Sequence, residues 1–337
     1  MNAWPLRWSH GSGFVEAVGA MLGPVEFRLP DGRGVQPFAV FPWADEPLPA
    51  DEQALQGLMA RGRGEWPCVP FGLGPGAGAE TLGWDHPIHG EAAHAAWQRV
   101  DDGRDASRID LRFDAPQTGP LESLERSVRG VDGRAQVECR LVVRVRADCR
   151  LPIGLHPTLR LPARPGAMRI EPGSFRFALG HPGEVEPGAD VLAPAQEFQS
   201  LAAAPRRGGG GELDLSHLPL AGNTESLAQL CAIDGRVAAT NLDEGWRFEL
   251  GWDAAVLPSC LLWVSNAGRR DWPWSRRHYA LGIEPVCTYF DQGVVACAAE
   301  NALSRRGVAT SVALQPGVPL QIDYRMAVTP IHPPAPT

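Results

Sequence analysis

The chain has 337 residues, 44% of them hydrophobic, so it can bury a large core in one long β-sandwich domain or in two domains. Its formal net charge of −8 argues against non-specific binding to nucleic acid or to an anionic membrane. All the basic side chains are arginines, and the absence of lysine excludes a Schiff-base mechanism.

Glycine and proline occur along the whole chain, with 38 and 32 residues, which favours many short strands and turns over long helices. The seven cysteines form no C-x-x-C pair, and their odd number predicts reduced thiols rather than a disulfide framework or a zinc ribbon. The N-terminus lacks a signal-peptide pattern and no stretch has the length of a membrane helix, so we expect a cytoplasmic protein.

The predicted elements begin with strands at 14–18 and 25–29, followed by an extended segment at 35–43. Residues 51–61 form the best helix candidate, because apolar residues recur at helical spacing before Gly62. Most of the remaining chain is predicted as strand. These segments are 108–114, 137–145, 169–179, 247–252, 261–265, 279–283, 308–314 and 320–328.

The strand at 108–114 shows the pattern most clearly, because Ile109, Leu111 and Phe113 alternate with charged residues. Strands follow each other with little helix between them. The sequence therefore predicts antiparallel sheets packed face to face in an all-β sandwich. We expect a single domain at 1–329 and a disordered tail at 330–337.

His156 lies in a largely apolar run between two strand-like segments, and Pro157 biases its backbone towards an extended conformation. An imidazole in such a place can give or take a proton near neutral pH. Glu284 is a lone carboxylate in an apolar strand before Pro285, where burial would raise its pKa towards that of a general base. The alternatives are a structural core histidine and an edge-strand glutamate that faces solvent.

Three histidines and Asp85 lie within ten positions. A metal site is one interpretation, but no helical spacing and no second cluster complete it, so no metal is predicted. His89 is the most suggestive, because the following Gly90 allows close approach of a ligand or of the backbone. The histidines are His86, His89 and His94.

Three motifs, in this order, resemble those of the aldose 1-epimerase, or galactose mutarotase-like, superfamily. They are His89-Gly90 with Trp97 eight positions on, the second histidine motif at 155–162, and Gly-Ile-Glu-Pro at 282–285. The segment at 63–72 is similar to the Pro-rich segment before the first histidine. The resemblance implies a large antiparallel β-sandwich with one or two short helices and a sugar-binding cleft on one sheet.

The resemblance also implies roles. His156 would protonate the ring oxygen of a sugar, Glu284 would take the proton of the anomeric hydroxyl, and His89 would orient the substrate. No cofactor is implied, because proton transfer suffices. The expected partner is a small sugar, either a hexose or a sugar phosphate, and the expected assembly is a monomer or a homodimer.

Further residues are candidates for substrate binding. Three tryptophans could stack on a sugar face, although most tryptophans in such a chain belong to the core. Glu225 lies roughly where the family has an aspartate that contacts sugar hydroxyls. Arg277 belongs to a basic cluster that could hold a phosphate, although a solvated loop is the ordinary interpretation. The tryptophans are Trp66, Trp84 and Trp263.

The sequence departs from the family pattern at several positions. The arginine after the Pro-rich segment is absent where Gly72 follows Phe71, the arginine after the first histidine motif is replaced near 92–94, and Thr158 stands where an aromatic is common. These departures concern the substrate more than the reaction. Two alternatives therefore stay open: a non-catalytic carbohydrate-binding or sensor protein on the same fold, and a metal-dependent sugar isomerase or lyase. The latter would use His86, His89 and His94.

Overall fold

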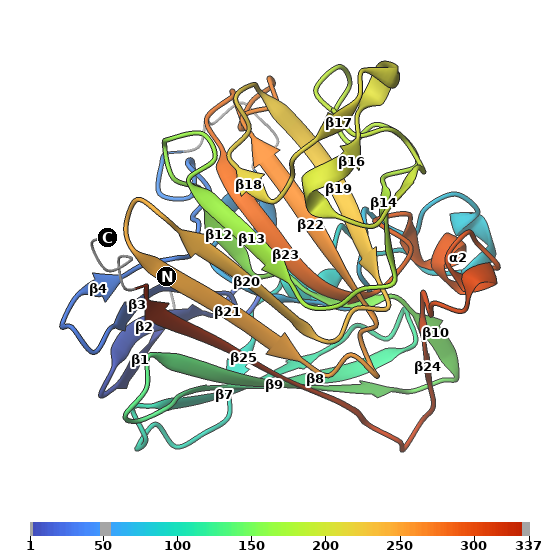
Figure 1. The fold of residues 1–337 in the computed structure, drawn as a ribbon. Coiled ribbons are helices and arrows are strands. Elements are labelled where there is room, and N and C mark those ends of the chain that lie inside the picture. The colour runs from blue at the N-terminus through green and yellow to red at the C-terminus, as the bar shows by residue number, and fades with distance from the viewer. Residues whose placement is uncertain (1–2, 48–54, 332–337) are drawn as a thin grey trace.

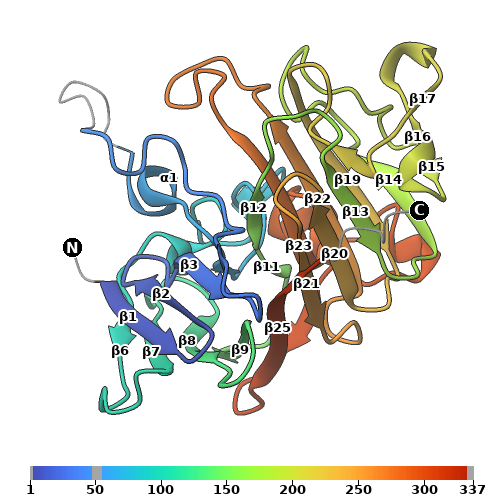
Figure 2. The same cartoon turned by 60° about the vertical axis from the view of Figure 1, so that its left-hand side comes forward.

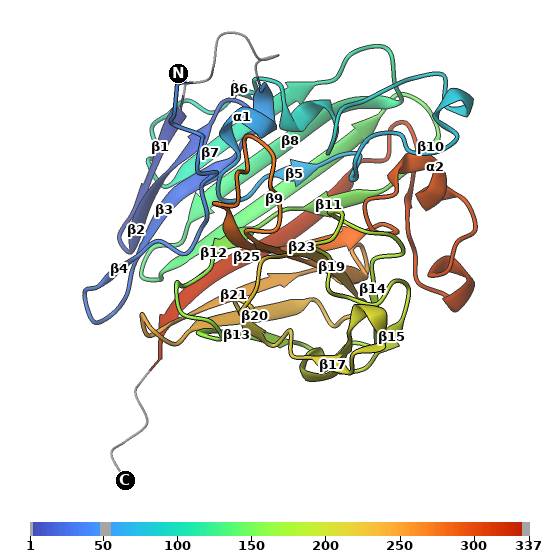
Figure 3. The ribbon, with the colours of Figure 1, turned by 90° about the horizontal axis from the view of Figure 1, so that it is seen from above.

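The computed structural model describes residues 3–47 and 55–331, and these residues form two large antiparallel sheets with two short α-helices (Figure 1). The prediction of an all-β sandwich is therefore confirmed. The two sheets pack face to face, and Figure 3 shows β25 and β9 in one layer beside β11 and β23 in the other.

The larger sheet has nine strands in the order β18-β13-β20-β21-β25-β9-β8-β7-β6. In β7 and β9 of this sheet buried side chains alternate with more exposed ones, because one face packs on the core and the other meets solvent. The strands are β6 (Gln98–Arg99), β7 (Arg108–Asp114), β8 (Leu121–Gly130), β9 (Gln136–Val145), β13 (Met168–Pro172), β18 (His217–Leu218), β20 (Arg236–Asn241), β21 (Trp246–Trp252) and β25 (Leu320–Pro330).

The second sheet has eight strands. Seven follow the order β15-β14-β19-β22-β23-β11-β5, and β12 also pairs with β23. Every residue of β19 and β22 is buried, so this sheet is covered on both faces. The strands are β5 (Pro67–Cys68), β11 (Ile153–Leu155), β12 (Thr158–Arg160), β14 (Phe177–Gly180), β15 (Glu197–Phe198), β19 (Thr224–Cys231), β22 (Ser259–Asn266) and β23 (Tyr279–Cys287).

Smaller elements flank the two sheets. A four-stranded N-terminal sheet and the β14–β17 region lie at opposite ends of the molecule (Figure 2). The remaining strands are β1 (Ala3–Trp8), β2 (Gly11–Glu16), β3 (Leu22–Arg28), β4 (Gly34–Val35), β10 (Cys149–Leu151), β16 (Ala204–Pro205), β17 (Glu212–Leu213) and β24 (Val312–Leu314). The helices are α1 (Gly57–Arg61) and α2 (Gly293–Ala298), with 3₁₀ turns at Ala79–Thr81, Glu91–Ala93, Leu201–Ala203, Arg207–Gly209 and Ser304–Arg306.

The pleat of β22 divides the apolar side chains between two clusters. Leu262 and Val264 point into the main core between the sheets. Leu261 and Trp263 point to the opposite face, where a second cluster includes Phe41 and Trp66. Side chains alternate between the two faces of β23 in the same way. Ile283 points into the main core, so its neighbour Glu284 projects to the second face. The second cluster forms the surroundings of the candidate site.

Some predicted elements were wrong in their extent. The segment 169–179 is two strands in different sheets, β13 and β14, because the chain turns at Gly173. A Cβ at Gly173 would lie 1.7 Å from Asp234 Oδ1, and Asp234 also accepts the Ser174 N–H at 3.0 Å. The predicted strand at 308–314 is limited to β24, and the extended segment at 35–43 contributes only its first residue to a strand.

The predicted helix at 51–61 is present only as α1, while 51–54 lie outside the described residues. Strand β25 continues to Pro330, and 332–337 also lie outside the described part, so the disordered tail stays a prediction. All seven cysteines lie in the described part of the chain and are free thiols. Within residues 3–47 and 55–331, no helix has the length and hydrophobicity needed to cross a bilayer.

Candidate active site

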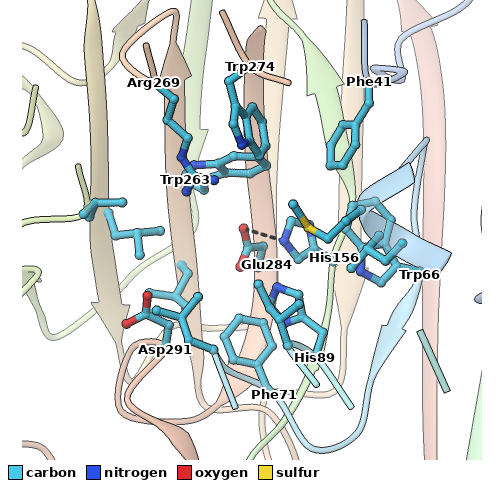
Figure 4. Close-up of a pocket in the computed structure, with 17 residues that line it drawn as sticks. Phe41, Trp66, Phe71, His89, His156, Trp263, Arg269, Trp274, Glu284 and Asp291 are labelled. Carbon is cyan, nitrogen blue, oxygen red and sulfur yellow. Dashed lines mark ion pairs between the residues drawn. The ribbon is translucent and has the colours of Figure 1, made fainter. Parts of the chain in front are cut away.

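His156 lies between β11 and β12, which both pair with β23. Its Nδ1 is 3.0 Å from Thr158 Oγ1, and the ring of Trp66 stacks on the imidazole with the centroids 4.2 Å apart. The backbone N–H of His156 donates to Trp66 O at 2.9 Å. These contacts fix the imidazole so that Nε2 faces a pocket on the second face of the eight-stranded sheet (Figure 4).

Glu284 projects into the same pocket from the middle of β23. Its carboxyl oxygen Oε1 is 3.4 Å from His156 Nε2, and both side chains are almost fully buried. Gly282 makes room for this carboxylate, because a Cβ there would lie 2.3 Å from Oε1. The Gly-Ile-Glu-Pro motif is thus explained locally, since a glycine two positions earlier on the same face leaves space for the acid.

His89 is the third polar group at the base of the pocket, with its ring centroid 5.1 Å from that of His156. Its backbone has a positive φ of 59°, and its N–H donates to Gly72 O at 2.8 Å. Gly90 packs on the chain beside it, where a Cβ would lie 2.2 Å from Val69 O. The His-Gly motif therefore reflects a close approach between backbones that a larger residue would prevent.

Burial controls the electrostatics of these three groups. It raises the pKa of Glu284 well above its usual value, and the charge of Asp291 acts in the same direction. Burial also lowers the pKa of His156 well below its usual value and that of His89 to about 3. Both histidines of this pocket are thus held neutral, and Glu284 is driven towards its protonated form.

The pocket encloses about 670 Å³, including its open mouth. Its walls are mostly apolar, and two of the three tryptophans singled out from the sequence, Trp66 and Trp263, belong to them. The lining residues are Phe41, Leu58, Met59, Trp66, Phe71, Leu73, Ile88, His89, His156, Val185, Leu227, Leu261, Trp263, Arg269, Trp274, Glu284 and Asp291.

Solved structures share this architecture over the whole chain. A protein from Escherichia coli K12 proposed to be an aldose 1-epimerase matches with a TM-score of 0.63 at 14% identity, over 98% of this chain and 99% of that one. A galactose mutarotase related enzyme from Lactobacillus acidophilus gives a TM-score of 0.61 at 12% identity, over 97% of each chain. The chain has the galactose mutarotase-like fold.

A third protein with this fold, an aldose epimerase homologue from C. elegans, gives a TM-score of 0.60 at 12% identity, over 98% of this chain and 99% of that one. No protein-family model matches the sequence, and no curated protein matches it either. The likeness at these identities establishes the mutarotase-like fold, and a fold alone does not determine the chemistry of its pocket.

Two charged residues of the pocket were missed as site residues by the sequence analysis. Asp291 follows β23, and its Oδ1 lies 2.9 Å from His181 Nε2. Burial would raise the pKa of Asp291, but the hydrogen bond and charge of His181 outweigh it, so the pKa is lowered. Arg269 comes from the loop after β22 and lies over the ring of Trp274 at 4.4 Å. No motif marks either residue, because loop conformation brings both to the pocket.

Glu225 lies behind the pocket wall rather than in it. This fully buried carboxylate accepts the Trp263 Nε1–H at 2.6 Å and the Ser265 hydroxyl at 3.0 Å, and it pairs with Arg269 at 3.1 Å. Its pKa is raised by burial, which the charge of Arg269 opposes. Glu225 thus contacts Trp263 and Arg269 from behind and does not itself line the cavity.

The structure places Trp84 and Arg277 away from the pocket. Trp84 lines a separate small hollow with His86 and Gly119. Arg277 makes a two-pronged ion pair with Glu46, at 2.5 and 2.8 Å, on the surface. Neither Trp84 nor Arg277 lines the pocket that contains His156 and Glu284.

The three histidines near position 90 do not converge. The imidazole of His86 contacts Pro87 O at 2.9 Å, and that of His94 contacts Ile88 O at 2.8 Å. Of the three, only His89 lines the pocket. Among the residues that the structure describes, no group of three or more His, Cys, Asp or Glu side chains is arranged to hold a metal ion.

Proposed function

We propose that this protein is an aldose 1-epimerase, which interconverts the α and β anomers of a sugar. One observation carries the proposal: His156 Nε2 and Glu284 Oε1 are 3.4 Å apart and both face a pocket large enough for a pyranose. The ring oxygen and the anomeric oxygen of a pyranose are bonded to the same carbon. An acid and a base that reach these two oxygens can open the ring.

In the proposed reaction His156 protonates the ring oxygen while Glu284 takes the proton of the anomeric hydroxyl. The bond between C1 and the ring oxygen breaks, and C1 becomes an aldehyde. Rotation about the C1–C2 bond exposes the other face of the carbonyl. The ring then closes as the two protons return, so atoms and charge balance without a metal or an organic cofactor.

The pair needs one shared proton for this chemistry. Burial favours the neutral arrangement, with the proton on Glu284 and neutral His156. Ring opening in the stated direction requires the proton to be on His156. The proton moves there from Glu284 across the 3.4 Å contact. The attraction between imidazolium and carboxylate offsets part of the desolvation cost of that state. Ring closure uses the same groups in reverse.

His89 supports the pair without sharing its proton. Its pKa of about 3 keeps the imidazole neutral, and its edge-to-face contact with His156 places it beside the oxygen that His156 serves. A neutral imidazole there can hydrogen-bond the sugar and orient it. A cytoplasmic location and a monomeric or homodimeric state stay predictions.

Exchange spectroscopy by NMR on equilibrated sugars tests the proposal, because it reports the rate between α and β signals without a coupled enzyme. We expect the protein to accelerate exchange of at least one aldopyranose well above the buffer rate. Glu249→Gln, on the exposed face of the other sheet, is the matched control and should keep the full rate. Folded protein that binds a sugar without exchange would instead identify a non-catalytic sugar-binding protein.

A further inference from the structure

We propose, on the basis of the function proposed above, that the substrate is an unphosphorylated pyranose with a methyl group at C5, a 6-deoxyhexose. The inference comes from where polar and apolar groups lie around the His156–Glu284 pair. It concerns the sugar rather than the reaction, and it differs from both sugars expected from the sequence, the hexose and the sugar phosphate.

The first step concerns charge. Among the described residues that line the pocket, Arg269 is the one arginine. Its guanidinium is neutralised by the buried Glu225 at 3.1 Å and lies against the ring of Trp274. A phosphate dianion would therefore meet the carboxylate of Asp291, while the guanidinium of Arg269 is already paired. Like charges placed side by side in a buried site repel each other strongly, so the pocket disfavours a sugar phosphate.

The second step orients the sugar. The ring oxygen joins C1 to C5, and C1 also carries the anomeric oxygen and C2. With His156 at the ring oxygen and Glu284 at the anomeric oxygen, C5 and its substituent lie on the side of His156 that faces away from Glu284. The hydroxyl at C2 lies on the Glu284 side of the pair.

The third step compares these two sides. Asp291 and Arg269 lie on the Glu284 side of the pair in Figure 4, whereas Phe41 and Trp66 lie on the His156 side. Trp66 stacks on His156 with its ring face, and its Nε1 is buried. The C2 hydroxyl thus faces polar side chains. A C5 substituent meets the rings of Phe41 and Trp66, and the polar group near them, His89, is assigned to the ring oxygen in the proposed reaction.

The fourth step gives the size of the effect. A hydroxyl left without a partner in an apolar pocket costs about 1–3 kcal/mol, which is roughly 5- to 150-fold in affinity. A methyl group buried there contributes about 0.8 kcal/mol, or about 4-fold, relative to hydrogen. The pocket should therefore prefer a methyl group at C5 over hydrogen, and hydrogen over a hydroxymethyl group.

Two sugar series that differ only at C5 test this order. One is D-fucose, L-arabinose and D-galactose; the other is 6-deoxy-D-glucose, D-xylose and D-glucose, with D-glucose 6-phosphate added. We expect kcat/KM for anomer exchange to fall at least 10-fold from the deoxyhexose to the hexose in the better series, with the pentose between them and no acceleration of the phosphate. Equal rates for deoxyhexose and hexose, or a preference for the phosphate, would overturn the inference.

Binding separates this inference from the proposed function. The affinities of the same sugars for the unmodified protein are measured by tryptophan fluorescence, because Trp66, Trp263 and Trp274 line the pocket. If the order of affinities holds but no sugar is exchanged, the substrate class stands as a ligand class and the proposed reaction fails. If sugars are exchanged without the expected order, the reaction stands and the inference fails. If the protein neither exchanges any sugar nor shows the expected order of affinities, both the proposed function and this inference are overturned.

Discussion

Two regions of this molecule each bury a glutamate, and they treat its charge in opposite ways. Glu65 lies fully buried beside the nine-stranded sheet, where its carboxylate pairs with the fully buried guanidinium of Arg126 and accepts the Tyr324 hydroxyl at 2.8 Å. Glu284 is also buried, but the titratable group beside it is the imidazole of His156, at 3.4 Å, and burial keeps that imidazole neutral.

The difference is the one expected between a structural carboxylate and the catalytic carboxylate that we propose. A buried charge that only supports the fold is neutralised by an opposite charge and hydrogen bonds, as Glu65 is. Among the residues that the structure describes, none supplies Glu284 with such a cation, and burial raises the pKa of Glu284 well above its usual value. Uncompensated burial beside a titratable partner in a pocket is typical of an acid–base site.

The largest effect is expected when the reactive carboxylate is removed. Glu284→Gln should reduce anomer exchange by about 10²- to 10⁴-fold, because the amide cannot accept the anomeric proton. The free energy of unfolding should change by less than about 1 kcal/mol, since no buried ion pair is broken. Exchange rates and urea unfolding measure the two effects. A stable variant with the full rate would contradict the role of Glu284.

Removal of the structural carboxylate should give the opposite result. Glu65→Gln leaves Arg126 charged and unpaired in the core, so unfolding should become about 3–5 kcal/mol easier in urea. Exchange per folded molecule should stay unchanged. The double variant Glu65→Gln with Arg126→Met serves as the control and should recover much of the loss. If Glu65→Gln alone lowered the free energy of unfolding by less than about 1 kcal/mol, the ion pair with Arg126 would not be what stabilises the buried charge of Glu65.

A third change disturbs the pocket carboxylate without removing it. In Gly282→Ala the new methyl group would lie 2.3 Å from Glu284 Oε1, so the carboxylate must move. A misplacement of about 1 Å can cost about 100-fold in rate. We expect a loss of this order in kcat with little change in the pH profile, measured by NMR exchange. Gly188→Ala, where a Cβ meets nothing within 4 Å although φ is positive, controls for backbone strain.

The smallest expected effect is that of pH. The exchange rate should change by about tenfold per pH unit on the acidic and on the alkaline side of its profile. Activity requires one proton on the pair. A second proton binds only below the lowered pKa of His156, and the last proton leaves only above the raised pKa of Glu284. The rate should therefore fall in acid below the ordinary histidine value of about 6.5 and fall again in alkali. If the exchange rate already fell as the pH was lowered from 7.5 to 6.5, the titrating group would be an exposed histidine instead.

Much of the fold could be predicted because local patterns decide it. The strand at 108–114 matches β7 residue for residue, since its alternation reflects one buried face. The segment 169–179 was predicted as one strand because a sequence pattern does not show which sheet a strand joins. The turn at Gly173 depends on Asp234, which is distant in sequence.

The site was predictable only where backbone constraints leave a motif. His89, His156 and Glu284 each sit next to a glycine or a proline in the sequence, and the structure brings all three to one pocket. Asp291 and Arg269 are placed by loops, so their positions depend on contacts such as that with His181 rather than on a spacing. The same dependence on loops explains why Trp84 and Arg277 lie elsewhere.

The most direct measurement is the anomer-exchange rate of Glu284→Gln, His156→Gln and the double variant, each corrected for the buffer rate and for the folded fraction. Since the two groups move one shared proton, the account predicts that the double variant is no slower than the slower single variant. Losses that multiply in the double variant, or a single variant that keeps the full rate, would contradict a His156–Glu284 pair acting as one unit.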